Sequence, residues 1–149
     1  MSTKEKILDT ALRMFNEQGI GPVTVRHIAK EMNISHGNLC YHFPTREEII
    51  FKLYENLAAE FDAVVKHYQS ISLDLKSVME STLVATRIFF KYRFIMIDLV
   101  RIMRSDIRIK LHYKALMERR KEEFMFIFQK LKNDGLMREE HYPGEYIML

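Results

Sequence analysis

The sequence predicts an all-α protein, and three observations support that prediction. The 149 residues are 48% hydrophobic and 29% charged, a composition too apolar for a disordered chain. Only 5 Gly and 3 Pro are present, which is few for a turn-rich all-β protein. Apolar residues recur at three- and four-residue spacing along most of the chain, as they do in amphipathic helices.

Composition also bounds the class of protein. A single Cys excludes a disulfide framework and is typical of a reducing cytosol. The longest stretch without a charge runs from Met32 to Thr45, 14 residues, which is too short and too polar to span a bilayer. We therefore expect a cytoplasmic protein that makes no use of a membrane.

The first predicted helix begins at Ser2 and ends at Gly19. Ser2 and Glu5 have the spacing of a capping box, in which each residue satisfies the backbone N–H of the other. Gly19 is suited to a helix end. The buried stripe of this helix is Ile7, Leu8, Ala11, Leu12 and Phe15.

Residues 24–43 have the layout of a helix-turn-helix. Thr24 and Ser35 are good N-cap residues for two short helices, and Asn33 between them tolerates a left-handed backbone. Ala29 is small enough for the two helices to approach closely. The residues expected to fill the angle between the helices are Ile34 and Leu39. With Leu39 facing inward, the other residues of the second helix face outward and are able to enter a major groove.

A long helix is predicted to follow, opened by a second capping box at Thr45 and Glu48. Its apolar face is Ile49, Leu53, Leu57, Phe61 and Val64. The period breaks at residues 70–74, where we expect a linker. Further helical patterns cover 74–91, 93–103 and 106–132 and end at Asn133-Asp-Gly135.

The predicted domain boundary lies at the start of the long helix. Residues 1–47 would form a three-helix DNA-binding domain, and residues 48–149 a C-terminal helical bundle. The last residues, from Glu145 to Leu149, have the pattern of another helix that is cut short. We therefore expect a bundle that is either unusually short or, as the preferred interpretation, C-terminally truncated.

Charge and motif point to different parts of the chain. Residues 87–121 carry 11 Lys/Arg against 3 Asp/Glu, whereas residues 1–54 carry 7 against 6. Gross charge alone would assign nucleic acid to the basic stretch. The helix-turn-helix layout assigns it to residues 24–43.

The most specific pattern is Ile34-Ser-His-Gly-Asn-Leu-Cys-Tyr-His-Phe-Pro-Thr-Arg-Glu-Glu-Ile49. It is preceded by Ile7-Leu-Asp-Thr-Ala-Leu-Arg-Met-Phe15, by Gly19 and by Thr24-Val-Arg-His-Ile-Ala-Lys30. On these residues, the segment from Ile7 to Leu53 resembles the N-terminal domain of TetR-family transcriptional regulators. Residues 92–136 more loosely resemble the regulatory domain of a bacterial repressor branch of that family. The resemblance implies a dimeric repressor that leaves a palindromic operator when a small ligand binds the C-terminal half.

The resemblance also implies which residues contact DNA. Thr24 and Arg26 match phosphate and groove contacts, and Arg46 matches a phosphate contact at the start of the fourth helix. The candidate contacts from the recognition helix and its cap are Ser35, His36, Gly37, Asn38, Tyr41 and His42. The family commonly has Lys, Thr and Tyr where this chain has His36, Asn38 and Cys40, and these departures alter the expected operator sequence. Asn38 is the candidate for direct readout, because Asn pairs bidentately with adenine.

A ligand pocket is expected among the large side chains between residues 89 and 128. The candidate lining is Phe89, Phe90, Arg93, Met96, Arg101, Met103, Tyr113 and Phe124. The same spacing describes a plain hydrophobic core, so both interpretations stay open. An inward-facing Arg93 or Arg101 would select an anionic ligand. Alternatively, the basic stretch meets acidic surfaces, including those of a second subunit.

The sequence thus predicts a regulator that binds double-stranded operator DNA as a homodimer and responds to a small hydrophobic or anionic effector. The alternative keeps the DNA binding but makes the C-terminal half a docking surface for another protein. We do not expect an enzyme, because no Ser-His-Asp arrangement or phosphate-cradling Gly loop occurs. The six His residues lack paired metal-ligand spacing, so neither a metal nor another cofactor is expected.

Overall fold

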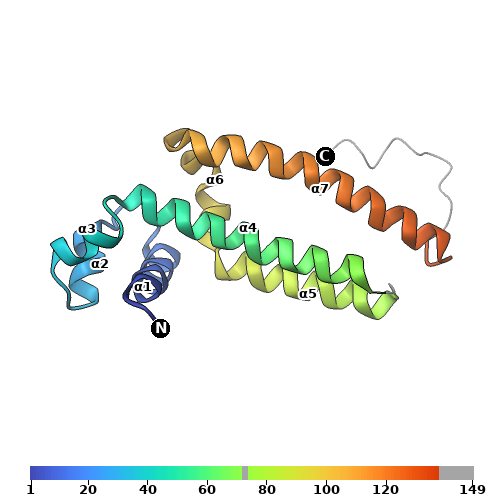
Figure 1. Cartoon of the computed structure of the whole chain (residues 1–149), viewed down its shortest axis with the longest axis horizontal. Helices are drawn as coiled ribbons and strands as arrows, with labels where there is room; N and C mark the ends of the chain where they lie inside the picture. Colours follow the sequence, from blue (N-terminus) through green and yellow to red (C-terminus); the bar gives the residue numbers. More distant parts are fainter. Residues whose placement is uncertain (72–73, 138–149) are drawn as a thin grey trace.

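The structure, a computed structural model, describes residues 1–71 and 74–137, and this part of the chain forms seven helices and no strand (Figure 1). The helices are α1 (Thr3–Gln18), α2 (Val25–Glu31), α3 (His36–His42), α4 (Arg46–Ser70), α5 (Leu75–Lys91), α6 (Arg93–Ser105) and α7 (Ile107–Asn133). The all-α prediction is confirmed. No helix in the described ranges is both long and apolar enough to cross a membrane.

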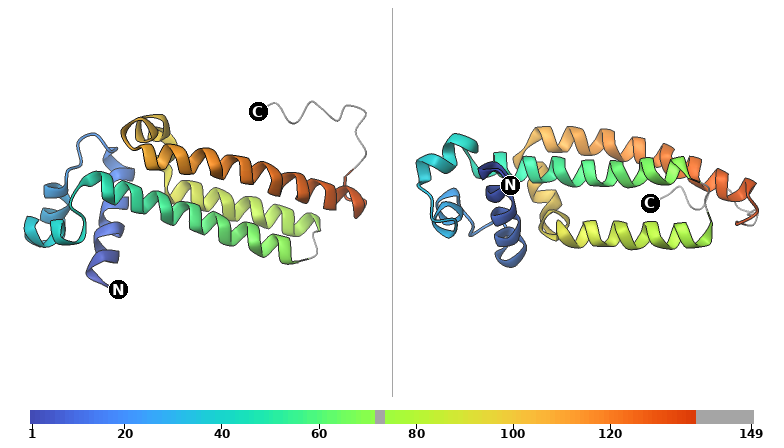
Figure 2. Two further views of the ribbon diagram at one scale, coloured as in Figure 1. Left: turned by 45° about the horizontal axis from the view of Figure 1, so that its top comes forward. Right: turned by 60° about the horizontal axis from the view of Figure 1, so that its bottom comes forward.

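The arrangement is elongated, with α1, α2 and α3 at one end (Figures 1 and 2). The long helix α4 leads away from this end, and α5 returns beside it. The shorter α6 then leads to α7, which runs along α4 toward the far end. A single helix therefore connects the helix-turn-helix to the C-terminal bundle.

Local signals determine the N-terminal helix ends as predicted. Ser2 and Glu5 form the capping box, and Gly19 ends α1 with a φ of 77°. The Thr24 and Ser35 side chains each accept a hydrogen bond from the backbone N–H three residues on. Asn33 has a φ of 55°, the left-handed conformation expected at the turn. Near the other end of the chain, α7 ends at the Asn133-Asp-Gly135 stop.

One predicted capping box is not formed, and another capping box was missed. The Thr45 side chain accepts from the Glu48 N–H at 3.2 Å, but the reciprocal bond of a capping box is not formed. The Glu48 carboxylate instead pairs with Arg108 of α7 at 2.9 Å, so a tertiary ion pair replaces the local bond. At the end of the predicted linker, Asp74 forms a capping box with Ser77 of α5 that the sequence did not indicate to us: the two residues bond reciprocally and start the helix. The helix expected at 145–149 lies outside the described residues.

One hydrophobic core extends through both halves of the chain. Its buried members include Ile7 and Phe15 of α1, Ile49 of α4, Phe94 of α6 and Ile109 of α7. The predicted domain boundary at residues 47 and 48 falls in the first turn of α4, inside this shared core. The N-terminal three-helix domain is therefore packed directly against the bundle, through α1.

The contact between α1 and the α5–α6 junction is specific as well as apolar. The Phe15 and Phe94 ring centroids lie 5.1 Å apart. Beside them, the Asn16 side-chain amide donates to the Lys91 carbonyl oxygen at 2.8 Å, and its oxygen accepts from the Phe94 N–H at 3.1 Å. Asn16 thus satisfies backbone groups at the end of α5 and the start of α6, where the helical pattern is interrupted.

Candidate nucleic-acid interface and ligand cavity

Helix α3 is anchored by one residue and presents the others to solvent. Leu39 is 0% exposed and belongs to the core, while Tyr41 is 84% exposed. The exposed group of predicted DNA contacts on this helix and its cap is Ser35, His36, Gly37, Asn38 and Tyr41. His42 is half-buried, as is Cys40, whose Sγ lies 3.4 Å from Nε2 of His36. This is the geometry of a recognition helix.

The turn before α3 is held by backbone hydrogen bonds. The Asn33 N–H donates to the Lys30 carbonyl at 3.1 Å, and the Ile34 N–H donates to the Ala29 carbonyl at 3.0 Å. Ala29 is buried, so the close approach of α2 and α3 occurs where the sequence placed its small residue. The angle of α3 relative to α2 is consequently set by the chain itself.

A shallow hollow of about 420 Å³ brings four of the predicted contacts together. Its lining is Thr24, Val25, Arg26, His36, Arg46 and Glu47. Arg26 is exposed and has no ion-pair partner among the described residues. Arg46, by contrast, donates to the Ile20 carbonyl at 2.9 Å and pairs with Glu47 at 3.0 Å. Its guanidinium therefore fastens the start of α4 to the loop after α1, a role that the sequence analysis did not assign to it.

A second, mostly apolar cavity of about 420 Å³ lies between the helices of the C-terminal bundle and is partly open to solvent, where Phe89 and Phe124 of its lining are exposed. It is lined by Tyr54, Leu57, Ala58 and Phe61 of α4, Phe89 of α5, Met96 and Leu99 of α6, and Tyr113, Leu116, Met117, Arg120 and Phe124 of α7. A cavity of this size and character suits a small molecule.

Half of the predicted pocket residues line this cavity. Those that do are Phe89, Met96, Tyr113 and Phe124. Phe90, Arg93, Arg101 and Met103 lie outside the lining, which corrects the sequence analysis. The Arg93 guanidinium stacks on the exposed Phe90 ring, 4.7 Å from its centroid. Arg101 is exposed, and its guanidinium lies beside Gly21 of the N-terminal half. The reason for the difference is that residues on the same helix point in different directions. The spacing of apolar residues alone did not show which side chains face α4 and the cavity.

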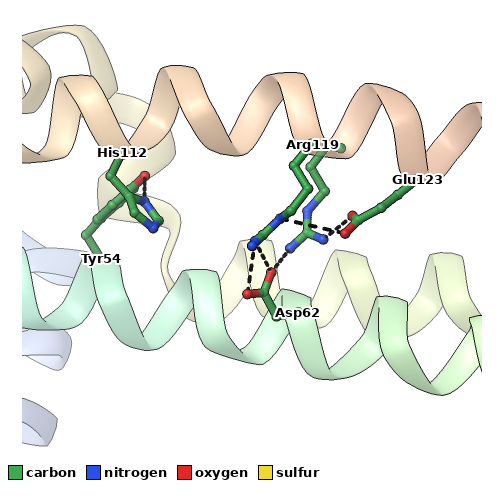
Figure 3. Close-up of polar contacts among 6 residues, drawn as sticks. Tyr54, Asp62, His112, Arg119 and Glu123 are labelled. Carbon is green, nitrogen blue, oxygen red and sulfur yellow. Dashed lines mark hydrogen bonds and ion pairs between the residues drawn. The ribbon is translucent and has the colours of Figure 1, made fainter.

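Sequence reasoning missed two polar residues of the cavity, Tyr54 and Arg120. The Tyr54 hydroxyl is hydrogen-bonded to Nδ1 of His112 at 2.9 Å (Figure 3), and burial raises the pKa of Tyr54 to about 12. Arg120 is buried and pairs with Asp62 of α4 and Glu123 of α7. Because 58 residues separate Arg120 from Asp62, no local spacing could have identified this pair.

Large apolar side chains are also exposed on the outside of the bundle. They are Met79, Leu83 and Phe90 of α5, Ile97 and Val100 of α6, and Ile107, Leu111, Met125, Phe126 and Phe128 of α7. Where such exposed apolar residues are contiguous, they mark interaction surfaces in soluble proteins.

Comparison with known proteins identifies the family. A model described as "Bacterial regulatory proteins, tetR family" matches residues 7–53, and one described as "Bacterial transcriptional repressor" matches residues 55–147. The chain belongs to the TetR family. The resemblance drawn from the helix-turn-helix residues is thereby confirmed, and the family is one of bacterial transcriptional regulators.

Individual TetR-family members match different parts of the chain. The biofilm operon negative regulator IcaR of Staphylococcus epidermidis is 42% identical over 53 residues, which is 36% of this chain and 29% of IcaR. YttP of Bacillus subtilis, described as a "probable HTH-type transcriptional regulator", is 27% identical over 128 residues, 76% of this chain and 61% of YttP. The chain thus spans less than two thirds of either curated relative.

A solved structure matches nearly the whole chain. A TetR-family transcriptional regulator from Marinobacter aquaeolei VT8 superposes with a TM-score of 0.90 at 28% identity, covering 98% of this chain and 71% of that one. The helix-turn-helix and the helical bundle therefore have the relative arrangement of a TetR-family regulator.

Proposed function

We propose that this chain is a sequence-specific DNA-binding transcriptional regulator, a dimeric repressor that a small ligand releases from a palindromic operator. The DNA-binding part of this proposal rests on the exposure pattern of α3. Leu39 anchors this helix in the core, and the solvent-exposed residues are His36, Gly37, Asn38 and Tyr41. Membership in the TetR family supports the same assignment.

Dimerisation and ligand release are supported by the C-terminal half. The exposed apolar side chains of α5, α6 and α7 suit a contact with a second copy of the chain. In such a dimer the two recognition helices would bind two DNA half-sites whose centres are about 34 Å apart, or a multiple of that distance. The cavity lies against α4, the helix that begins directly after the helix-turn-helix. A ligand that favours one position of α4 would change the separation of the two reading helices.

Replacing Asn38 with Ala should weaken operator binding by about 1–3 kcal/mol, with the loss confined to particular base positions. The reason is that Asn38 is the exposed side chain best suited to pair with a base edge, and its side chain caps nothing in the fold. In-vitro selection of DNA sites by the wild-type chain and by Asn38→Ala is the measurement. A palindrome whose information content drops at the same positions in each half-site is the expected result.

Arg26→Ala provides the contrast, because an exposed guanidinium at this hollow is placed for phosphate rather than base contact. It should weaken binding to all sequences evenly and reduce the slope of log K against log salt by about 1. Gln69→Ala, at an exposed position near the far end of α4, should change neither quantity. Equal losses on every sequence for both Asn38→Ala and Arg26→Ala would contradict the proposed roles.

Gly37→Ala should separate folding from DNA binding. Nothing lies within 4 Å of a Cβ built at Gly37, so the chain itself has room for a methyl group. In the helix, Ala is favoured over Gly by up to about 1 kcal/mol, so the melting temperature should stay equal or rise. Operator affinity should fall about tenfold if α3 lies close to the groove floor, since the added methyl group would hold it away. Unchanged affinity would show that this part of α3 does not approach the DNA.

The alternative, a protein partner docked on the C-terminal half, is favoured by the same exposed apolar side chains. Operator release distinguishes the two functions. A gel-shift assay in which a small molecule bound in the cavity leaves the DNA complex intact, while sedimentation shows a monomer, would favour the docking function.

A further inference from the structure

The cavity in the C-terminal bundle contains one charged residue among its described lining, Arg120. Its side chain is only 10% exposed, so its charge cannot be screened by water as a surface charge is. The remaining lining is aromatic or aliphatic, apart from the hydroxyl groups of Tyr54 and Tyr113. Whether the positive charge of Arg120 is already paired therefore decides if the cavity accepts an anionic or an uncharged ligand.

The charge of Arg120 is already balanced inside the protein. One of its terminal nitrogens, Nη1, pairs with the Glu123 carboxylate, and the other, Nη2, pairs with the Asp62 carboxylate. Arg119 shares both carboxylates, with Nη2 at 2.8 Å from Oδ1 of Asp62 and Nε at 3.7 Å from Oε1 of Glu123 (Figure 3). Two guanidinium groups and two carboxylates leave this cluster with no net charge.

An anionic ligand would have to displace one of these carboxylates. The displaced carboxylate would stay on α4 or α7, next to the ligand and with only Arg119 as its partner. Three negative charges would then face two guanidinium groups, and such an excess charge at a half-buried position is costly. An uncharged ligand leaves the cluster intact and gains from the apolar walls. Tyr113 lines the cavity and its hydroxyl has no hydrogen bond within the described ranges, so it is available to bond one polar group of such a ligand.

We infer that the cavity binds an uncharged, apolar small molecule with one hydrogen-bonding group, and that it rejects an anion of the same shape because Asp62 and Glu123 already neutralise Arg120. This inference rests on the proposed function for its regulatory meaning. It also chooses between the two effector classes that the sequence left open, hydrophobic and anionic.

The test is a binding assay on the full chain with N-phenyl-1-naphthylamine, an uncharged dye that fluoresces in apolar sites. The competitors are 1-decanol and decanoate, which have the same chain length and differ in charge at neutral pH. We expect 1-decanol to displace the dye at a concentration at least about tenfold lower than decanoate. Equal displacement by both compounds would overturn the inference.

A charge variant tests whether the cluster causes the selectivity. Glu123→Gln retains an acceptor for Arg120 but gives the cluster a net positive charge, so decanoate affinity should rise about tenfold while 1-decanol affinity stays the same. Glu122→Gln is the matched control, because it makes the same charge change at the adjacent exposed position of α7. Equal decanoate affinities of the two variants would overturn the role of Arg120.

A blocking variant tests whether the dye occupies the cavity and not the exposed apolar faces. Leu116→Trp adds bulk at a half-buried lining position and should abolish the dye signal while circular dichroism still shows a helical chain. Retained dye binding would overturn the location. Operator binding is measured separately: if 1-decanol binds but leaves the DNA complex intact, ligand release fails and the inference stands. If 1-decanol does not bind, the inference fails while the DNA-binding function stands.

Discussion

Replacing Phe94 with Ala is expected to lower the free energy of unfolding by about 3–5 kcal/mol, a large part of the stability of a domain this size. Phe94 is 2% exposed and packs against Phe15 of α1, with Ile95 buried next to it. Removing the ring would leave a cavity where α1 meets the α5–α6 junction. Because Asn16 depends on the same junction for both of its hydrogen bonds, the backbone there has little freedom to collapse into the space.

Urea unfolding followed by circular dichroism measures this loss. Phe90→Ala is the matched control, since Phe90 lies four residues earlier, is exposed, and contacts the Arg93 guanidinium at the surface. Its replacement should change the free energy of unfolding by less than about 1 kcal/mol. Similar losses for the two variants would contradict the role of Phe94 in joining the two halves.

Removing both carboxylates around Arg120, in Asp62→Ala with Glu123→Ala, is expected to cost about 3–5 kcal/mol of stability. The guanidinium would remain buried against the cavity wall without an opposite charge, and the protein would have to desolvate it or move α7 outward. Arg119 also loses its partners, but half of its side chain is exposed, so water replaces them at little cost.

Adding Arg120→Leu to this double variant should recover most of the lost stability, because an aliphatic side chain suits the apolar lining. Thermal and urea unfolding of the double and triple variants give the comparison. Glu17→Ala, which breaks the exposed pair with Arg13, serves as the surface control and should cost less than about 1 kcal/mol. A triple variant no more stable than the double variant would show that a buried unpaired charge is not the cause.

The N-terminal half was predictable because its signals are local. The caps at Ser2, Thr24 and Ser35 and the turn at Asn33 involve residues at most a few positions apart, and each was found where the spacing placed it. Leu39 was predicted inside from the helix-turn-helix layout, and the structure buries it.

The errors arose where a residue has a partner far along the chain. Glu48 was expected to bond to its own helix start, but Arg108 takes its carboxylate. Arg46 has a contact that its spacing did not indicate, a hydrogen bond to the Ile20 carbonyl 26 residues away, and its phosphate contact stays a prediction. In both cases the charged side chain bonds to a residue that is distant in the sequence, and the local spacing of residues carries no information about such a partner.

The sequence by itself determined the helix-turn-helix, the family and the outward face of the recognition helix, because period, caps and turn are encoded within about twenty residues. Only the tertiary structure decided which of the many aromatic and basic side chains of the C-terminal half face one another. It placed Arg120, not Arg93 or Arg101, at the cavity and balanced its charge with Asp62 and Glu123. The physical reason is that a helix presents residues in every direction, and packing against α4 selects the ones that become buried.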